Sequence, residues 1–147
     1  MNILDLDIGA GVYFLASLDN EPIGSFNSCE GLGCEIVVEQ REEGGNNGYV
    51  WQLPTRIKYS NIKLTRPVTV ASVSLHKWFN SLHSGMKRHT AVIEAHGPAG
   101  IPIGVWGLLD VMPVRWTGPS LSPDQNKIAT ETLELAHHGF FTPKLPI

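Results

Sequence analysis

Charged side chains are scarce in this sequence. Asp, Glu, Lys and Arg together make up 17% of its 147 residues, against about 25% in an average soluble protein. Disordered chains and long coiled coils are richer in charge, so the composition argues against both classes. A surface with so little charge also suggests that part of it is covered in an assembly.

Cysteines, long apolar runs and an export signal are few or missing as well. Cys29 and Cys34 are the only cysteines. Two thiols are too few to hold a secreted scaffold together, and we expect them to be free, although a hairpin could bring them close enough to oxidise. The sequence has no apolar run of 18 residues and no basic N-terminus followed by an apolar stretch. These absences predict a soluble chain made in a reducing cytoplasm, with no membrane anchor.

Motifs for catalysis and for cofactors are missing too. The glycine-rich stretch 44–48 lacks the Lys-Ser/Thr pair of a phosphate-binding loop, and there is no nucleophile elbow, zinc-protease motif or paired-carboxylate spacing. His76 and His83 would lie about 10 Å apart on a helix, too far to share one ion, and His137 and His138 would point to opposite faces of a strand. The sequence therefore predicts no enzyme activity, no cofactor and no metal.

The net charge of −3 is unevenly distributed along the chain. Residues 1–43 hold nine acidic and one basic residue (net −8), and residues 44–147 hold five acidic and ten basic residues (net +5). No overall positive field is available to bind nucleic acid or anionic lipid. The polarity can either align identical subunits head to tail or reflect solvated charge on one face.

What the sequence does contain is alternation of apolar and polar residues, together with 15 glycines and 10 prolines. This pattern predicts a turn-rich, mainly β protein. The prolines are expected to end strands, with Pro54 closing one strand, Pro67 closing another, and 113–119 forming a loop. The expected strands cover residues 12–18, 23–28, 34–43, 49–53, 59–66, 90–96, 101–111 and 127–137.

One helix is predicted around residues 75–82. Leu75, Trp78, Phe79 and Leu82 recur at helical spacing, Ser72 or Ser74 can cap the start, and Gly85 stands where a left-handed C-terminal cap is expected. Trp78 and Phe79 should close one end of the core.

The stretch 34–43 is expected to be a half-buried strand that becomes polar toward its end. Ile36 and Val38 fall on one face, and Glu35, Val37, Glu39 and Arg41 fall on the other. The run 44–48 tolerates positive φ and can form a flexible turn or the tip of an extended arm. Trp51 beside it, like Trp116, can either fill the core or anchor a neighbouring subunit.

Two stretches resemble a known family. Arg41–Val50 (REEGGNNGYV), continued by Leu53–Arg66 (LPTRIKYSNIKLTR), and Pro113–Leu121 (PVRWTGPSL), followed by Asn126–Gly139 (NKIATETLELAHHG), are similar to the tail tube proteins of contractile phage tails and extracellular contractile injection systems. Both stretches occur in the family's order, and the resemblance covers about residues 11–141.

The resemblance implies a small antiparallel β-sandwich or barrel with one flanking helix, which forms hexameric rings that stack into a hollow tube inside a contractile sheath. It implies a single domain over 1–147, with an N-terminal extension at 1–10 and a loose tail at 142–147. The partners implied are other copies of the chain, the sheath protein, and baseplate and terminator or cap proteins, with cargo or DNA passing through the lumen without specific binding. The protein would be made in the bacterial cytoplasm and become part of a phage tail or injection-system particle.

Two alternatives stay open at this point. One is a tube-initiating subunit that seats the first ring on the baseplate and has the same fold. The other, of a different class, is a β-barrel that binds a small ligand.

Two sets of residues are candidates for assembly and transport. An arm formed by the glycine-rich run has too few side chains to fold upon itself, so contacts with a neighbouring subunit should order it. The lumen of a conduit should be polar, which selects the polar faces of the wall strands. The arm candidates are Gly44, Gly45, Asn46, Asn47, Gly48, Tyr49 and Trp51; the lumen candidates are Glu35, Glu39 and Arg41 on one strand and Thr130, Thr132 and Glu134 on the last.

Overall fold

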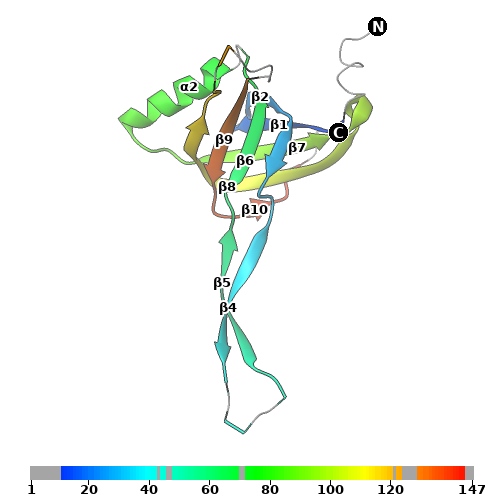
Figure 1. Ribbon diagram of the computed structural model, residues 1–147, viewed down its shortest axis with the longest axis vertical. Coiled ribbons are helices and arrows are strands. Elements are labelled where there is room, and N and C mark those ends of the chain that lie inside the picture. Colours follow the sequence, from blue (N-terminus) through cyan, green and yellow to red (C-terminus); the bar gives the residue numbers. More distant parts are fainter. Residues whose placement is uncertain are drawn as a thin grey trace.

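The computed structural model describes residues 11–42, 44–45, 48–69, 72–120, 122–123 and 129–144. A mainly antiparallel β body carries one helix at its side, and a long hairpin projects from it (Figure 1). No helix in these ranges has the length and apolarity needed to cross a membrane. The elements are β1 (Tyr13–Leu18), β2 (Glu21–Phe26), β3 (Ser28–Glu30), β4 (Cys34–Arg41), β5 (Trp51–Tyr59), β6 (Ile62–Pro67), α2 (Ser72–Ser81), η1 (Leu82–Ser84), β7 (His89–His96), η2 (Pro98–Gly100), β8 (Pro102–Thr117), β9 (Thr130–Ala136) and β10 (Phe140–Phe141).

The main sheet curls into a barrel. Its strands follow the order β2-β1-β7-β8-β9-β6-β3, all antiparallel, and β10 pairs with β8. Only Asn27 separates β2 from β3, so the strands at the two ends of the sheet are consecutive in the chain. The Asn27 N–H donates a hydrogen bond to the Thr65 carbonyl at 2.8 Å, which connects the β2–β3 corner to β6. The predicted fold class, mainly β with one flanking helix, is confirmed.

Helix α2 covers the interior of the barrel. Leu75 is fully buried in the core, and Trp78 and Phe79 pack against it, as the helical spacing predicts. Gly85 ends the helical stretch with a positive φ, as expected of a C-cap, but its φ of 135° and ψ of 146° differ from the left-handed helical conformation. The helix instead tightens into the η1 turn, where the Gly85 N–H donates to the Leu82 carbonyl at 3.1 Å.

Two prolines expected to end strands lie inside them. Pro54 sits in β5 opposite Val38, at a bulge where Thr55 is the extra residue and donates its hydroxyl to the Val37 carbonyl at 2.7 Å. Pro113 sits in β8 at a second bulge, so the expected loop over 113–119 is strand as far as Thr117. Both prolines belong to stretches with a strand on one side only among the described residues, where a missing N–H breaks no ladder.

A buried ion pair joins the helix to four strands. Arg66 on β6 and Glu131 on β9 are 3% and 1% exposed, and Arg66 Nε lies 2.7 Å from Glu131 Oε1. Ser72 at the start of α2 donates to Glu131 Oε1 at 2.7 Å, and Trp116 Nε1 on β8 donates to Oε2 at 3.0 Å. Arg66 Nη1 also donates to the Ile23 carbonyl of β2 at 2.9 Å, so both ionic groups are satisfied inside the barrel.

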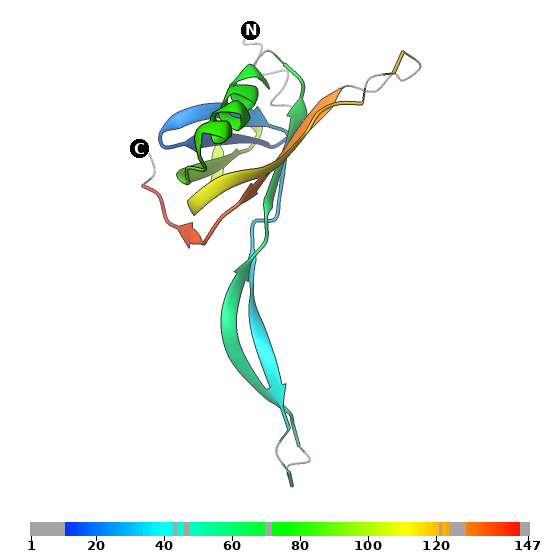
Figure 2. The ribbon, with the colours of Figure 1, turned by 90° about the vertical axis from the view of Figure 1, so that its left-hand side faces the viewer.

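The hairpin β4–β5 leaves the barrel as an arm (Figure 2). Strands β3 and β6 lead directly into the arm. The segments that connect them to it, around Gly31 and Asn61, pass close to each other. Gly31, with φ 95°, has no room for a side chain there because a Cβ atom would collide with the Asn61 carbonyl. The expectation that residues 34–43 form a half-buried strand of the barrel wall is wrong, since within the described ranges β4 pairs only with β5 and is mostly exposed.

Candidate functional site: the arm and a polar sheet face

The arm has one apolar face that nothing in the described chain covers. Ile36 of β4 lies directly opposite Ile57 of β5, and Val38 lies opposite Pro54. Ile36, Ile57 and Val38 are 57%, 53% and 43% exposed. Monomeric proteins rarely leave a contiguous row of large apolar side chains in water, and such a row is typical of a contact surface.

The other face of the arm carries all the charged side chains of β4 and β5, together with Val37, Leu53 and Trp51. Glu35 pairs across the strands with Lys58, Glu39 with Leu53, and Arg41 with Trp51. The alternation of Ile36 and Val38 with Glu35, Glu39 and Arg41 that the sequence predicts is therefore confirmed. These three lumen candidates lie on the arm and not on the barrel.

The arm candidates lie at its far end. Gly44 and Gly45 form a turn, with φ 90° at Gly45, and Tyr49 and Trp51 stack edge to face with ring centroids 5.3 Å apart. Both rings are largely exposed, at 57% and 41%. Gly48 also lies at this end, whereas Asn46 and Asn47 fall outside the described residues.

A second uncovered surface is the outer face of four neighbouring strands: β8 from residue 113 to 117, β9, β6 and β3. We call it the polar panel. Trp116, Leu133, Leu64 and Cys29 point inward to the core, so the residues between them point outward. One row across the panel reads Arg115, Glu134, Lys63, Glu30, with charges that alternate in sign from strand to strand.

The next row of the panel consists of hydroxyls. Thr117 lies opposite Thr132, Thr132 opposite Thr65, and Thr65 opposite Ser28. The Thr65 and Thr132 hydroxyls are 3.2 Å apart, and Asn61 Nδ2 donates to Glu134 Oε1 at 3.1 Å beside them. The panel is thus polar and balanced in charge, with two acidic and two basic side chains in its charged row.

The panel contains the lumen candidates of β9, together with residues of β8, β6 and β3 that were not identified from the sequence. Thr130, Thr132 and Glu134 alternate along β9 with the buried Glu131, Leu133 and Leu135, so the division of this strand into two faces is confirmed. The panel residues missed are Ser28, Glu30, Lys63, Thr65, Arg115 and Thr117. The alternation of apolar and polar residues along β6 indicates that Lys63 and Thr65 point outward. Their alignment with Glu134 and Thr132 depends on the register between β6 and β9, which the sequence alone does not reveal.

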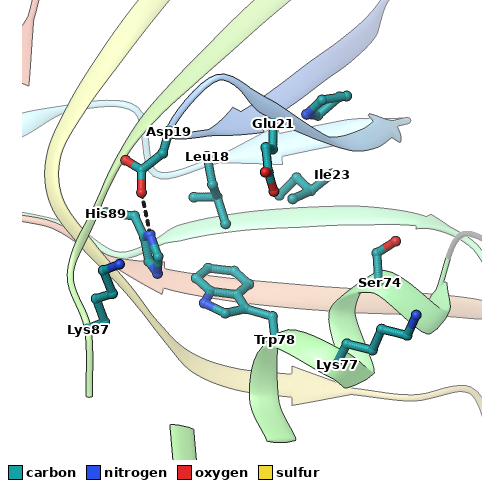
Figure 3. A pocket seen from close by; sticks show the side chains of 10 residues that line it. Leu18, Asp19, Glu21, Ile23, Ser74, Lys77, Trp78, Lys87 and His89 are labelled. Atoms are coloured by element: carbon teal, nitrogen blue, oxygen red, sulfur yellow. Dashed lines mark hydrogen bonds and ion pairs between the residues drawn. The ribbon is translucent and has the colours of Figure 1, made fainter. Parts of the chain in front are cut away.

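A surface cleft of about 510 Å³ lies between α2 and the β1–β2 turn (Figure 3). Two of its polar side chains, Asp19 and His89, contact each other. His89 Nδ1 lies 2.6 Å from Asp19 Oδ2, and the Thr90 N–H donates to Asp19 Oδ1 at 3.0 Å. The contact with His89 and the bond from Thr90 hold the pKa of the Asp19 carboxyl below its usual value. The Asp19 contacts thus fasten the turn to β7. Glu21, Ser74, Lys77 and Lys87 also line the cleft, and among the described residues the buried Trp78 Nε1–H has no hydrogen-bond partner.

Comparisons with known proteins agree with this geometry. A family model described as T4-like virus tail tube protein gp19 matches residues 10–141. No curated protein matches the chain by sequence at a significant level.

Solved structures share the fold. A chain of the sheath–tube complex of the PVC extracellular contractile injection system in its extended state is 25% identical with a TM-score of 0.72, over 87% of this chain and 86% of that one. A chain of the anti-feeding prophage baseplate is 24% identical with a TM-score of 0.74, over 88% and 90%. Hcp1 from Salmonella typhimurium is 16% identical with a TM-score of 0.57, over 86% and 82%.

Proposed function

Because this chain belongs to the T4-like virus tail tube protein family, we propose that its copies close into hexameric rings that stack into the hollow inner tube of a contractile particle. It is a structural protein and not an enzyme. The observation that carries the proposal is the pair of uncovered surfaces, an apolar arm face and a polar panel, on one small barrel. A tube subunit needs both: one surface to bind its neighbours and one to face the bore.

The arm serves as the contact between copies. Burial of a large aliphatic side chain stabilises an interface by about 1.5–3 kcal/mol. The row of Ile36, Val38 and Ile57 gains that energy only when another copy covers it. Tyr49 and Trp51 at the far end supply the exposed aromatic anchors that are typical of interface centres. The arm candidates Gly44, Gly45, Asn46, Asn47 and Gly48 lie between β4 and β5 in the sequence, and we propose that they take part in the same contact.

The polar panel lines the bore. A conduit that must release its cargo should present neither a large apolar patch nor a field of one sign. The alternating charges and hydroxyls of the panel, with Thr132 and Glu134 at its centre and Thr130 at the start of β9, meet both requirements. Where the arm covers a neighbouring copy with its apolar face, Glu35, Glu39 and Arg41 on the opposite face extend the wall as far as Leu53 and Trp51, which share that face.

The proposed tube also has proposed partners. Similar chains come from a sheath–tube complex, a tube terminator and a baseplate. We therefore propose a sheath around the tube, a terminator or cap at one end and a baseplate at the other, with cargo or DNA passing through without specific binding. The proposal covers the main tube and the tube-initiating subunit alike.

The alternative of a ligand-binding barrel has no support in the described residues. The barrel interior is filled by the core and by the Arg66–Glu131 pair. The cleft beside α2 lies outside the barrel.

Labelling of single cysteines tests the lumen assignment. In a Cys34→Ser background, Thr132→Cys and Glu39→Cys should react slowly, in tubes with sealed ends, with a maleimide coupled to a globular protein, whereas Val73→Cys on the outer side of α2 should react fast. The remaining native thiol, Cys29, reacts slowly because burial raises its pKa to about 11. All variants should react equally after the tubes are dispersed. Fast labelling of Thr132→Cys in intact tubes would exclude the panel from the bore.

A further inference from the structure

The polar panel is built so that copies of it can continue one another. Its strands alternate in direction, and their number is even: β8, β9, β6, β3. In a head-to-tail arrangement, β3 of one copy therefore meets β8 of the next copy in antiparallel orientation. An antiparallel pair is the arrangement that the rest of the panel already has.

Both edges of the panel are open in the described part of the chain. Strand β3 pairs only with β6, and the pairing of β8 with β7 stops at Val111, which leaves residues 113–117 paired with β9 alone. Such edges are ready to pair with another strand, and closed rings remove them.

The charged row ends in opposite signs at these two edges. Arg115 stands on β8 at one edge and Glu30 on β3 at the other, and both are exposed. Each has a neighbour of opposite charge on one side only, Glu134 for Arg115 and Lys63 for Glu30. The row of hydroxyls likewise ends in Thr117 and Ser28.

We infer that Glu30 of one copy pairs with Arg115 of the next copy around the ring, and that Ser28 and Thr117 meet beside them. This inference rests on the proposed ring and names the residues that set its register. With this pairing the charges alternate without a break around the bore. A slip of two residues between β3 and the neighbouring copy's β8 would place a hydroxyl opposite one of the two charges and an apolar residue opposite the other. An exchange of either charge would place like signs together, so the row selects one register.

Charge exchange tests the pairing. Glu30→Arg and Arg115→Glu each place like charges at every seam, and each should lower the yield of rings about tenfold or more while the monomer still folds, because both side chains are exposed. The double variant Glu30→Arg/Arg115→Glu restores opposite charges between copies and should recover rings relative to either single variant. The like charges that it places beside Lys63 and Glu134 are already present one at a time in the single variants. Lys77→Glu, which reverses an exposed base on α2, is the matched control and should assemble normally.

A covalent trap provides an independent measurement. Ser28 and Thr117 lie three strand spacings apart in one copy, about 14 Å, which is too far for a disulfide. In the variant Ser28→Cys/Thr117→Cys/Cys34→Ser, oxidation of the assembled protein should therefore link neighbouring copies into a ladder that ends at the hexamer on a denaturing gel.

The outcomes separate this inference from the proposed function. Wild-type protein that forms no rings would contradict the proposed function itself. Wild-type rings together with unaffected single variants, a double variant no better than the single ones, or cysteines that fail to cross-link in rings would each overturn the pairing of Glu30 with Arg115 and leave the tube proposal standing.

Discussion

The Ile36→Asp variant is expected to fold like the wild-type protein and to form no rings or tubes. Ile36 is 57% exposed in the subunit, so its replacement costs the isolated monomer little. In the assembly, the same position would bury an unpaired carboxylate, which costs several kcal/mol for each contact. A loss of about 3 kcal/mol weakens each contact more than a hundredfold. Sedimentation of the purified variant beside a thermal melt measures both effects.

Gln40→Asp is the matched control for this variant. It adds the same charge to the same face of β4, at a position that is already polar and lies opposite Gln52. It should assemble far better than Ile36→Asp. If Ile36→Asp still formed tubes of normal length, the apolar face of the arm would not be the contact between copies.

The second large effect is expected inside the barrel, at Glu131. Its replacement by Ala leaves the Arg66 guanidinium buried without a counter-charge and removes the acceptor of Ser72 and Trp116. Breaking a buried pair in this way costs about 3–5 kcal/mol, a large part of the roughly 5–15 kcal/mol that stabilises a domain. Chemical denaturation should report this loss. Glu134→Ala, on the outer face of the same strand, should cost about 0.5 kcal/mol or less, and equal losses in the two variants would contradict the role of the buried pair.

The same carboxylate predicts a pH dependence. Burial opposes the ionisation of Glu131, but hydrogen bonds from Ser72, Arg66 and Trp116 outweigh it and hold its pKa below the ordinary 4.5. A carboxyl with a lowered pKa in the folded state contributes stability above its ordinary pKa, and this contribution disappears as the pH falls through the folded value. Wild-type stability should therefore fall below about pH 4.5 more steeply than that of Glu131→Gln. Parallel pH profiles for the two proteins would show that Glu131 does not titrate in this way.

The elements that the sequence predicts best are those whose apolar face is buried within the chain. Strands β1, β7 and β9 and helix α2 each bury one face in the barrel, so their periodicity reports their environment directly. Residues 34–41 show the same alternation, but their apolar face is exposed in the subunit. Alternation predicts that a face will be covered and does not say by what, which explains why the arm was expected in the barrel wall.

The assembly surfaces were predictable only within single strands. The two faces of β9 follow from its sequence, whereas the rows of the panel depend on the register among four strands far apart in the chain. The prediction that Pro54 and Pro113 interrupt strands failed for a related reason. Proline breaks a hydrogen-bonded ladder inside a sheet but is tolerated at an edge, and the sequence does not show which strands are at an edge. Glu131 interrupts the apolar face of its strand in the sequence, and only the fold supplies Arg66 as its partner.

Electron microscopy of the purified wild-type protein tests the central claim most directly. The account predicts rings with sixfold symmetry, or tubes of stacked rings with an open bore, from a subunit of 16.1 kDa. A monodisperse monomer of 16.1 kDa at high protein concentration would contradict it.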